Sequence, residues 1–142
     1  MKNVSFQGER GAYSEAAAKS FFNNDIKTIP LTTFADILEN TSKDITEYSI
    51  LPVENSLEGS VGESYDLLYS TDLNATGETY HRIEHCLIGF GKIEEIDTVY
   101  SHPQALGQCR NFIEKNTMKT IPTYDTAGSV KIIQELNKKN CA

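Results

Sequence analysis

The sequence predicts an α/β protein built as two small lobes, and three observations support that class. Short apolar and β-branched runs alternate with amphipathic stretches, which is the pattern of successive strands and helices. A length of 142 residues with 39% hydrophobic content suits one domain or two small lobes that share a crevice. A polar break at residues 71–74 separates two such series, so we expect lobes over residues 1–73 and 74–142.

The composition argues against several classes of partner. A formal net charge of −7, with 13 scattered Lys and Arg residues, opposes nucleic-acid binding, which needs clustered positive charge. No apolar run reaches the ~20 residues of a membrane-spanning helix. The chain starts without a signal-peptide pattern, so we expect a cytoplasmic protein with a small-molecule partner. Three widely spaced cysteines, Cys86, Cys109 and Cys141, indicate neither a disulfide framework nor a zinc motif.

The first predicted elements are a strand, a glycine-punctuated loop and a helix. The strand covers residues 2–6, and the loop Q-G-E-R-G-A-Y-S contains Gly8 and Gly11, which can adopt positive φ. Ser14 is expected to cap the helix, which continues to residue 22. A loop of this kind before a helix N-terminus can hold an anion, and a tight turn without a ligand is the alternative.

A second strand and helix follow, and a third strand leads to a polar cluster. The strand covers residues 26–31, and Thr33 with Asp36 resembles a capping box for the next helix. The third strand, residues 48–53, is expected to be buried and to end at Glu54, Asn55 and Ser56. Ligands of open α/β sheets bind at such strand ends.

The polar cluster combines a carboxylate, an amide and a hydroxyl with nearby backbone N–H groups. Gly59 and Gly62 let the backbone approach a ligand closely. The alternative is an ordinary strand-to-helix turn with Ser60 as the N-cap of a helix over residues 61–69.

The second lobe is predicted to start with a long extended run over residues 75–90. His81 and His85 lie four residues apart in it, and on a strand this spacing separates them by about 13 Å, too far for one metal ion. We therefore expect no metal site, and interpret both histidines as polar or half-buried strand residues, with His85 a candidate to face the crevice.

A strand over residues 98–100 is followed by S-H-P-Q-A-L-G-Q-C. Ser101 is the expected N-cap and Pro103 lies in the first helical turn. Gln104 and Gln108 are one turn apart on one face of the helix, with Leu106, Phe112 and Ile113 on its apolar side. A strand over residues 118–122 and a helix from Asp125 or Thr126 complete the series.

Three segments, in chain order, resemble prephenate dehydratase. They are G-E-R-G-A-Y-S-E-A-A, L-P-V-E-N-S-L-E-G-S-V and Y-S-H-P-Q-A-L-G-Q-C, with a turn at residues 125–127, so that the resemblance covers essentially the whole chain. It implies two α/β lobes like those of type 2 periplasmic binding proteins, with an active site between them. It also implies the cofactor-free conversion of prephenate to phenylpyruvate, with loss of water and CO2, in L-phenylalanine biosynthesis.

The resemblance also implies roles for individual residues. Asn55, Gln108 and His102 are the catalytic candidates, with His102 a possible general acid, and the expected substrate-binding residues are Glu54, Ser56, Ser101, Gln104, Thr126 and Ser14. Glu54 is interpreted as a brace, because a carboxylate would repel a dianionic substrate.

The sequence departs from the family pattern in one respect. It contains no T-R-F motif, whose threonine is the family's expected acid, and no regulatory ACT segment, so we expect a C-terminally incomplete fold. An uncovered sheet edge would then favour a homo-oligomer. Two other functions stay open, namely arogenate dehydratase and a non-catalytic module that binds a small carboxylate.

Overall fold

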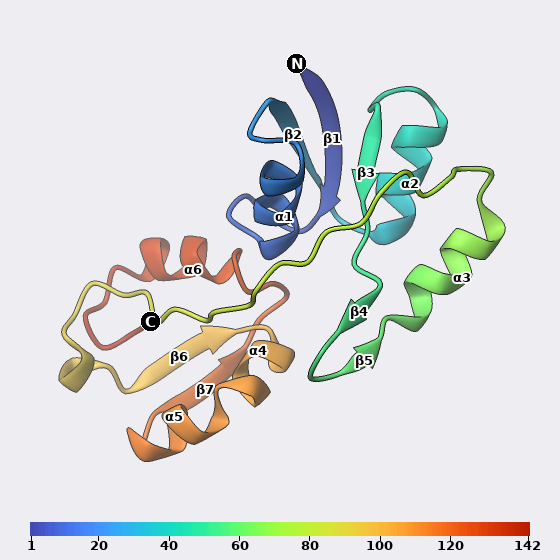
Figure 1. The fold of residues 1–142 in the computed structure, drawn as a ribbon. Coiled ribbons are helices and arrows are strands. Elements are labelled where there is room, and N and C mark those ends of the chain that lie inside the picture. Colours follow the sequence, from blue (N-terminus) through green and yellow to red (C-terminus); the bar gives the residue numbers. More distant parts are fainter. The chain divides into compact units, whose positions relative to one another are not determined.

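The structure is a computed structural model that describes residues 1–142, and the chain divides into two compact units. These are Met1–Arg82 and Ile83–Ala142, and each combines helices with a parallel sheet (Figure 1). The predicted α/β class is therefore confirmed. The division into functional lobes at residues 73 and 74 stays a prediction.

A parallel three-stranded sheet organises the first unit. It consists of β1 (Lys2–Gln7), β2 (Ile26–Leu31) and β3 (Tyr48–Ile50) in the order β2-β1-β3.

The helices α1 (Tyr13–Phe21) and α2 (Phe34–Ser42) cover opposite faces of this sheet. Val4 packs with Ala18 of α1, whereas the Ser5 hydroxyl donates to the Ile37 carbonyl of α2 at 3.2 Å. Since successive strand side chains point to opposite faces, the two helices lie on different sides. The predicted capping box at the start of α2 is confirmed, because Thr33 and Asp36 exchange both hydrogen bonds.

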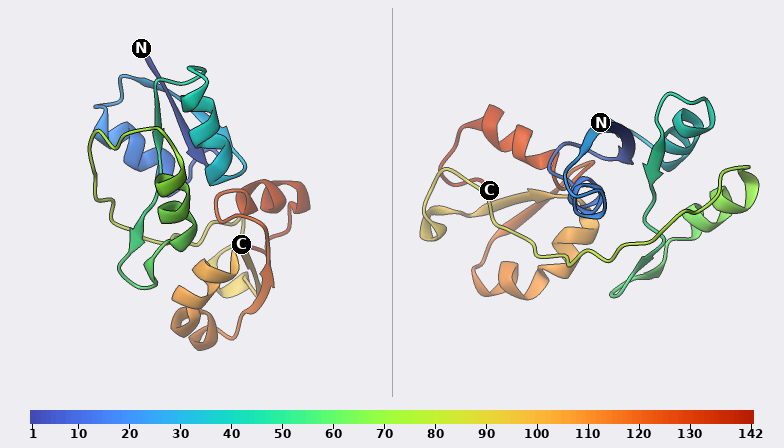
Figure 2. Two further views of the ribbon diagram at one scale, coloured as in Figure 1. Left: turned by 90° about the vertical axis from the view of Figure 1, so that its right-hand side faces the viewer. Right: turned by 45° about the horizontal axis from the view of Figure 1, so that its top comes forward.

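The third strand is shorter and less buried than the sequence predicted. It ends at Ile50, and its residues are only half-buried. Pro52 has no N–H with which to extend the ladder, and Val53 is 38% exposed. The chain instead forms a separate hairpin of β4 (Glu54–Asn55) and β5 (Gly59–Ser60), which stands apart from the sheet in both views of Figure 2.

The helix after this hairpin, α3, covers Gly62–Ser70. Its N-cap position is held by Val61. Ser60 is therefore a strand residue in the ladder with Glu54 and not the helix cap.

A second parallel sheet organises the Ile83–Ala142 unit. It pairs β6 (Thr98–Ser101) with β7 (Lys119–Pro122) after the short helix η1 (Ile93–Glu95). On its other edge β6 meets the C-terminal residues, since Tyr100 N–H donates to the Ala142 carbonyl at 2.8 Å.

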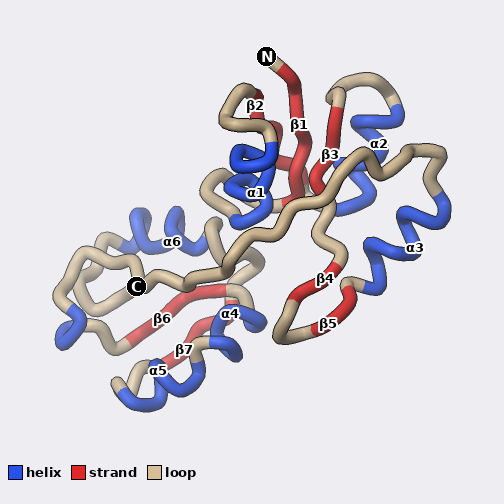
Figure 3. Tube along the Cα trace, in the orientation of Figure 1, coloured by secondary structure: helices blue, strands red, loops and turns tan.

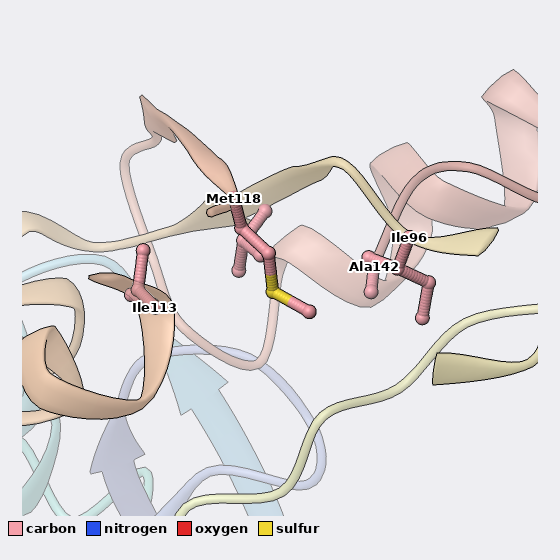
Figure 4. Packing of buried hydrophobic residues seen from close by; sticks show 5 residues of the cluster. Ile96, Ile113, Met118 and Ala142 are labelled. Carbon is pink, nitrogen blue, oxygen red and sulfur yellow. The ribbon is translucent and has the colours of Figure 1, made fainter. Parts of the chain in front are cut away.

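The core of this unit lies between the sheet and α5 (Arg110–Lys115), with Ile96, directly after η1, packed beside them. The cluster in Figure 4 consists of five buried side chains: Ile96, Val99, Ile113, Met118 and Ala142. Leu106 and Cys109 pack against this cluster. Burying a large apolar side chain typically contributes about 1.5–3 kcal/mol, so this cluster is the main stabilising element of a small unit.

The long strand predicted over residues 75–90 is not formed. Figure 3 shows the segment between α3 and η1 as a loop, without regular secondary structure. A strand needs a hydrogen-bonded neighbour, and no partner strand forms a ladder with these residues. An alternation of polar and apolar residues was therefore not enough to make a strand here.

Three predicted helix starts are wrong. At α1 the N-cap is Ala12, and Ser14 lies inside the first turn. At α4 (Pro103–Gln108) the N-cap is His102, whose Nδ1 accepts the Gln104 N–H, while Ser101 remains in β6. At α6 (Ser129–Leu136) the turn around Asp125 precedes the helix, which begins at Ser129.

The helix expected after β6 is also interrupted. Cys109 separates α4 from α5 (Arg110–Lys115), and Gly107 lowers the helix propensity just before that break. Ile113 is buried as predicted, but Phe112 is 43% exposed.

Candidate functional site

The glycine loop after β1 is held closed by a buried carboxylate, Glu15. Gly8 and Gly11 adopt φ of 113° and 92°, as the sequence predicted. Their N–H groups are already bonded within the protein, Gly8 to the Leu31 carbonyl at 2.9 Å and Gly11 to Glu15 Oε2 at 2.7 Å. Glu15 thus occupies the position that an anionic ligand would take at this loop.

Glu15 is also joined to the neighbouring strand and helix. Its Oε1 accepts the Thr28 hydroxyl at 2.7 Å and lies 2.9 Å from the Lys19 ammonium. Burial alone would raise the pKa of Glu15, but the Gly11 N–H, Lys19 and Thr28 together lower it from 4.5 to about 2. The carboxylate is therefore charged and fixes the loop on which Ser14 is placed.

In the first unit the predicted polar cluster lies on the β4–β5 hairpin. Glu54 and Ser56 are exposed and Asn55 is half-buried. Gly59, with φ of 80°, allows the sharp return of the chain. Asn55 Oδ1 accepts the Leu57 N–H at 2.9 Å, so that the turn uses the amide oxygen and the NH2 end has the hydrogens to donate to a ligand.

In the second unit the carboxyl ends of β6 and β7 form one edge of the parallel sheet. Ser101 pairs with Pro122 in register, and Thr123 N–H donates to the Ser101 carbonyl at 2.9 Å. His102 follows directly, with its Nδ1 3.2 Å from the Gln104 nitrogen. The structure therefore brings Ser101, His102 and Gln104 together at the sheet edge where α/β proteins bind ligands.

The turn after β7 that contains Thr126 is built around Asp125. Asp125 Oδ2 accepts the Gly128 N–H at 2.6 Å, and its carbonyl accepts the Ser129 hydroxyl at 2.7 Å. Thr123 and Ser129 hydroxyls lie 2.6 Å apart. These bonds fix the half-buried Thr126 in a defined turn next to the edge of the sheet.

Gln108 is the last residue of α4, and its side chain meets His85. The two atoms His85 Nε2 and Gln108 Oε1 lie 2.6 Å apart in a partly buried contact. His85 comes from the irregular segment before η1, which the sequence predicted as a strand.

Glu15 is the residue that sequence reasoning missed, and for His85 it missed the partner, Gln108. A glutamate three residues into a helix was a usable signal for Glu15. The spacing of His85 from His81 drew attention to metals, whereas its partner is 23 residues away in sequence. No cluster of three or more His, Cys, Asp or Glu side chains could hold a metal ion.

Three other features of the chain, namely a surface depression, the cysteines and the length of the helices, do not involve the predicted site residues. A shallow surface depression beside α2 is lined by Glu39, Asn40, Lys43 and Ile45, away from every predicted site residue. All three cysteines are reduced. No helix is both long enough and apolar enough to cross a lipid bilayer.

Comparison with known families decides the relationship. The model of the family described as prephenate dehydratase matches residues 4–142. The chain belongs to the prephenate dehydratase family. All three polar segments described above lie within the match.

Two curated relatives illustrate the range of the prephenate dehydratase family. Arogenate dehydratase 2 of Petunia hybrida is 41% identical over 132 residues, which are 92% of this chain and 33% of the petunia protein. Prephenate dehydratase of Methanocaldococcus jannaschii is 40% identical over 138 residues, 94% of this chain and 50% of the relative. The chain thus spans half or less of the length of these relatives.

Solved structures support the same fold. Prephenate dehydratase from Staphylococcus aureus superposes with a TM-score of 0.80 at 25% identity, covering 98% of this chain and 52% of that one. GqqA, described as a novel type of quorum quenching acylase, gives a TM-score of 0.88 at 31% identity, over 99% of this chain and 52% of its own.

Proposed function

We propose that the protein is a prephenate dehydratase of L-phenylalanine biosynthesis. In this reaction the ring hydroxyl of prephenate leaves as water after protonation, the ring carboxylate leaves as CO2, and phenylpyruvate remains. Aromatisation drives the step, and no cofactor is required. The family match over residues 4–142 and the name of the archaeal relative support this proposal.

The state of two amide side chains is the observation that carries the proposal. Asn55 and Gln108 each have the carbonyl oxygen engaged by the protein, by the Leu57 N–H and by His85 respectively. The Asn55 amide therefore has its NH2 end as a hydrogen-bond donor for a ligand, and the family resemblance implies that Gln108 contacts the substrate. Because the chain has a net charge of −7, local N–H donors, such as an amide NH2, must supply the attraction for a dicarboxylate substrate.

The remaining predicted residues have roles that fit substrate positioning. Ser101, Gln104, Thr126 and Ser56 offer hydroxyl or amide donors, Glu54 braces the hairpin, and Ser14 lies on the loop that Glu15 fixes. All of these assignments are proposals that rest on the family resemblance and on the positions described above.

His102 is better suited to positioning than to acid catalysis. Its Nδ1 accepts a backbone N–H, so the neutral ring carries its hydrogen on Nε2. Donating a hydrogen bond from Nε2 is easy, but giving that proton away would leave an imidazolate. The general acid for the leaving hydroxyl is therefore expected elsewhere in the full-length protein.

Arogenate dehydratase is the second candidate function, favoured by the name of the petunia relative. Arogenate carries an ammonium group where prephenate has a ketone, and an ammonium favours a nearby carboxylate. Glu54, exposed on the hairpin beside Asn55, is the group in this chain that could meet it. A non-catalytic module that binds a small carboxylate is the third possibility.

One experiment separates the three functions. The full-length protein is assayed for phenylpyruvate formation from prephenate and for phenylalanine formation from arogenate, and calorimetry measures the binding of both compounds. We expect turnover of prephenate with the higher kcat/KM. Higher kcat/KM for arogenate would reassign the substrate, and binding without turnover would indicate a binding module. Neither binding nor turnover would overturn the proposal.

Further expectations belong to this proposal. The two units are expected to act as the lobes of a type 2 periplasmic-binding-protein-like fold, with Asn55 and Gln108 lining a cleft. The protein is expected in the cytoplasm and as a homo-oligomer, for which sedimentation of the full-length protein is the test. Its ligand is expected to be a small molecule and not a nucleic acid or a membrane.

A further inference from the structure

The strand order β2-β1-β3 creates a topological switch point at the carboxyl end of β1. The connection through α1 leads from β1 to β2, and the connection through α2 crosses back to β3 on the other side of β1. The loops that follow β1 and β3 therefore diverge, and ligands of open α/β sheets bind at such a point. Figure 1 shows that β3, which is parallel to β1, continues from this edge toward the β4–β5 hairpin that carries Asn55.

Arg10 lies at the tip of the loop that follows β1. The Ala12 N–H donates to the Glu9 carbonyl at 3.0 Å, which closes a four-residue turn with Arg10 and Gly11 in its central positions. Gly11 has φ of 92°, the positive value that a type II turn requires at its third position. A Cβ added to Gly11 would meet no atom within 4 Å, so the tip of this turn borders open space.

The positive charge of Arg10 is only weakly engaged by Glu15. The Lys19 ammonium lies 2.9 Å from Glu15 Oε1, whereas Arg10 Nη1 lies 3.8 Å from the same atom, which is too far for a hydrogen bond. Lys19 thus already balances the charge of the buried carboxylate. The Arg10 side chain is 66% exposed, so its guanidinium can meet a ligand from solvent.

A guanidinium at this position suits a carboxylate ligand. Its planar fork can donate two parallel N–H bonds to the two oxygens of a carboxylate. The N–H groups of Gly8 and Gly11 are bonded within the protein and cannot supply this attraction. In a chain of net charge −7, Arg10 therefore provides a local positive charge at the switch point of the first sheet.

We propose that Arg10 is a substrate-binding residue that holds the side-chain carboxylate of prephenate. This inference rests on the proposed function. Prephenate has two carboxylates, of which the one on the ring leaves as CO2. A cation paired with the leaving carboxylate would stabilise the substrate more than the transition state, because the negative charge must move into the ring. Arg10 therefore binds the carboxylate that phenylpyruvate retains.

Binding of phenylpyruvate tests this role, because the product keeps only the side-chain carboxylate. In the full-length protein, Arg10→Met keeps a similar aliphatic stem without the charge, and Arg10→Lys restores the charge without the fork. We expect the Kd for phenylpyruvate, measured by calorimetry, to rise roughly 10- to 100-fold in Arg10→Met. The KM for prephenate should rise by a similar factor with little change in kcat, and Arg10→Lys should recover part of the loss.

Lys27→Met is the matched control for the loss of one positive charge. Lys27 is exposed near the amino end of β2, in the same sheet but at the opposite edge from the switch point. This variant should bind phenylpyruvate like the wild type. Thermal unfolding of Arg10→Met should also match the wild type, because an exposed ion pair at 3.8 Å contributes little to stability. An equal loss of affinity in Arg10→Met and Lys27→Met would overturn the inference.

The binding and turnover measurements separate this inference from the proposed function. Binding of phenylpyruvate that depends on Arg10, without turnover of prephenate or arogenate, would contradict the proposed function and support Arg10 as a carboxylate-binding residue. Turnover of prephenate with wild-type Kd and KM in Arg10→Met would support the proposed function and overturn the inference. A fall in kcat with unchanged Kd for phenylpyruvate would also overturn it, because Arg10 would then not hold the retained carboxylate.

Discussion

At the scale of single residues, the hairpin amide Asn55 offers a direct test of anion recognition. Asn55→Asp keeps the shape and the acceptor for the Leu57 N–H, but replaces the NH2 donor by a charged oxygen. Losing one hydrogen bond to a charged group costs about 1.5–3 kcal/mol, so we expect kcat/KM for prephenate to fall by roughly one to two decades or more.

The control for this variant is Asn74→Asp, which makes the same change at an exposed loop residue. Steady-state kinetics and thermal unfolding of both variants in the full-length protein provide the measurement. Wild-type kinetics in Asn55→Asp would mean that Asn55 serves only the turn.

Glu15 makes the stability of the first unit depend on pH. Because its folded-state pKa is lowered from 4.5 to about 2, its contribution to stability is present above pH 4.5 and disappears as the pH falls toward 2. Each pKa unit corresponds to about 1.4 kcal/mol, so Glu15→Gln should lower the free energy of unfolding by up to about 3 kcal/mol at pH 7.

Urea unfolding of the 142-residue chain at pH 7 and pH 3 measures the effect of Glu15→Gln. The difference from wild type should shrink at the lower pH. Glu39→Gln is the matched control, because Glu39 pairs with Lys43 on the surface of α2 and such exposed pairs contribute about 0–1 kcal/mol. An equal loss of unfolding free energy in both variants would show that the buried hydrogen bonds of Glu15 contribute no more than an exposed ion pair.

At the scale of elements, the capping box of α2 is the clearest local signal that the structure confirms. The Asp36 N–H donates to Thr33 Oγ1 at 3.1 Å, and the Thr33 N–H donates to Asp36 Oδ2 at 3.0 Å. Replacing Thr33 by alanine leaves the first turn of the helix without its acceptor. We expect Thr33→Ala to lower the free energy of unfolding by about 1 kcal/mol, as measured by urea denaturation.

The neighbouring residue provides the control for the cap. Thr32 is exposed and uses its backbone carbonyl, not its hydroxyl, to accept from Gln7. Thr32→Ala should therefore change stability by much less. If Thr33→Ala lowered the free energy of unfolding no more than Thr32→Ala does, the helix would be stabilised by packing of Ile37 and Leu38 alone.

Elements whose signals are local were predictable from the sequence, and those that depend on distant partners were not. The bounds of β2, Ile26–Leu31, were predicted correctly, because apolar and β-branched residues lie between turn residues. Residues 75–90 look equally strand-like, but a strand needs a neighbour that the pattern cannot reveal. The cap of α1 was misassigned because the helix begins without a side-chain cap, with Ala12 at the N-cap position.

The candidate site shows the same division. The position of Ser101 at a strand end follows from the parallel pairing of β6 with β7, and Thr126 lies in the turn that comes after β7. The contact between His85 and Gln108 joins residues 23 apart in the chain, and no sequence pattern predicts it. The hairpin that presents Asn55 was missed because its strands have only two residues each.

At the scale of the whole molecule, the 142-residue chain alone is expected to turn over prephenate poorly. It spans half or less of the compared relatives, and its sequence contains no T-R-F segment to supply the expected acid and a cationic group. General acid catalysis typically contributes about 10²–10⁴ in rate, so kcat should fall at least by that factor relative to the full-length protein.

Parallel assays of phenylpyruvate formation by the two proteins measure this difference. Adding the C-terminal part of a close relative in trans should recover some activity. Near-native turnover by the 142-residue chain alone would place the acid within it, and His102→Phe would then be the first variant to make.

The position of β1 in the middle of its sheet affects how the protein can be made. Both strands that pair with β1, namely β2 and β3, follow it in the chain. The first strand therefore leaves the ribosome before either of its partner strands has been made. We expect the emerging chain to gain protection from proteases only after Ile50 has left the exit tunnel. Protease digestion of ribosome-bound chains stalled before and after that point measures this protection. Protection before Ile50 emerges would mean that β1 and β2 form a stable pair alone. Until then Val4 and Phe6, both fully buried in the folded unit, are exposed to chaperones.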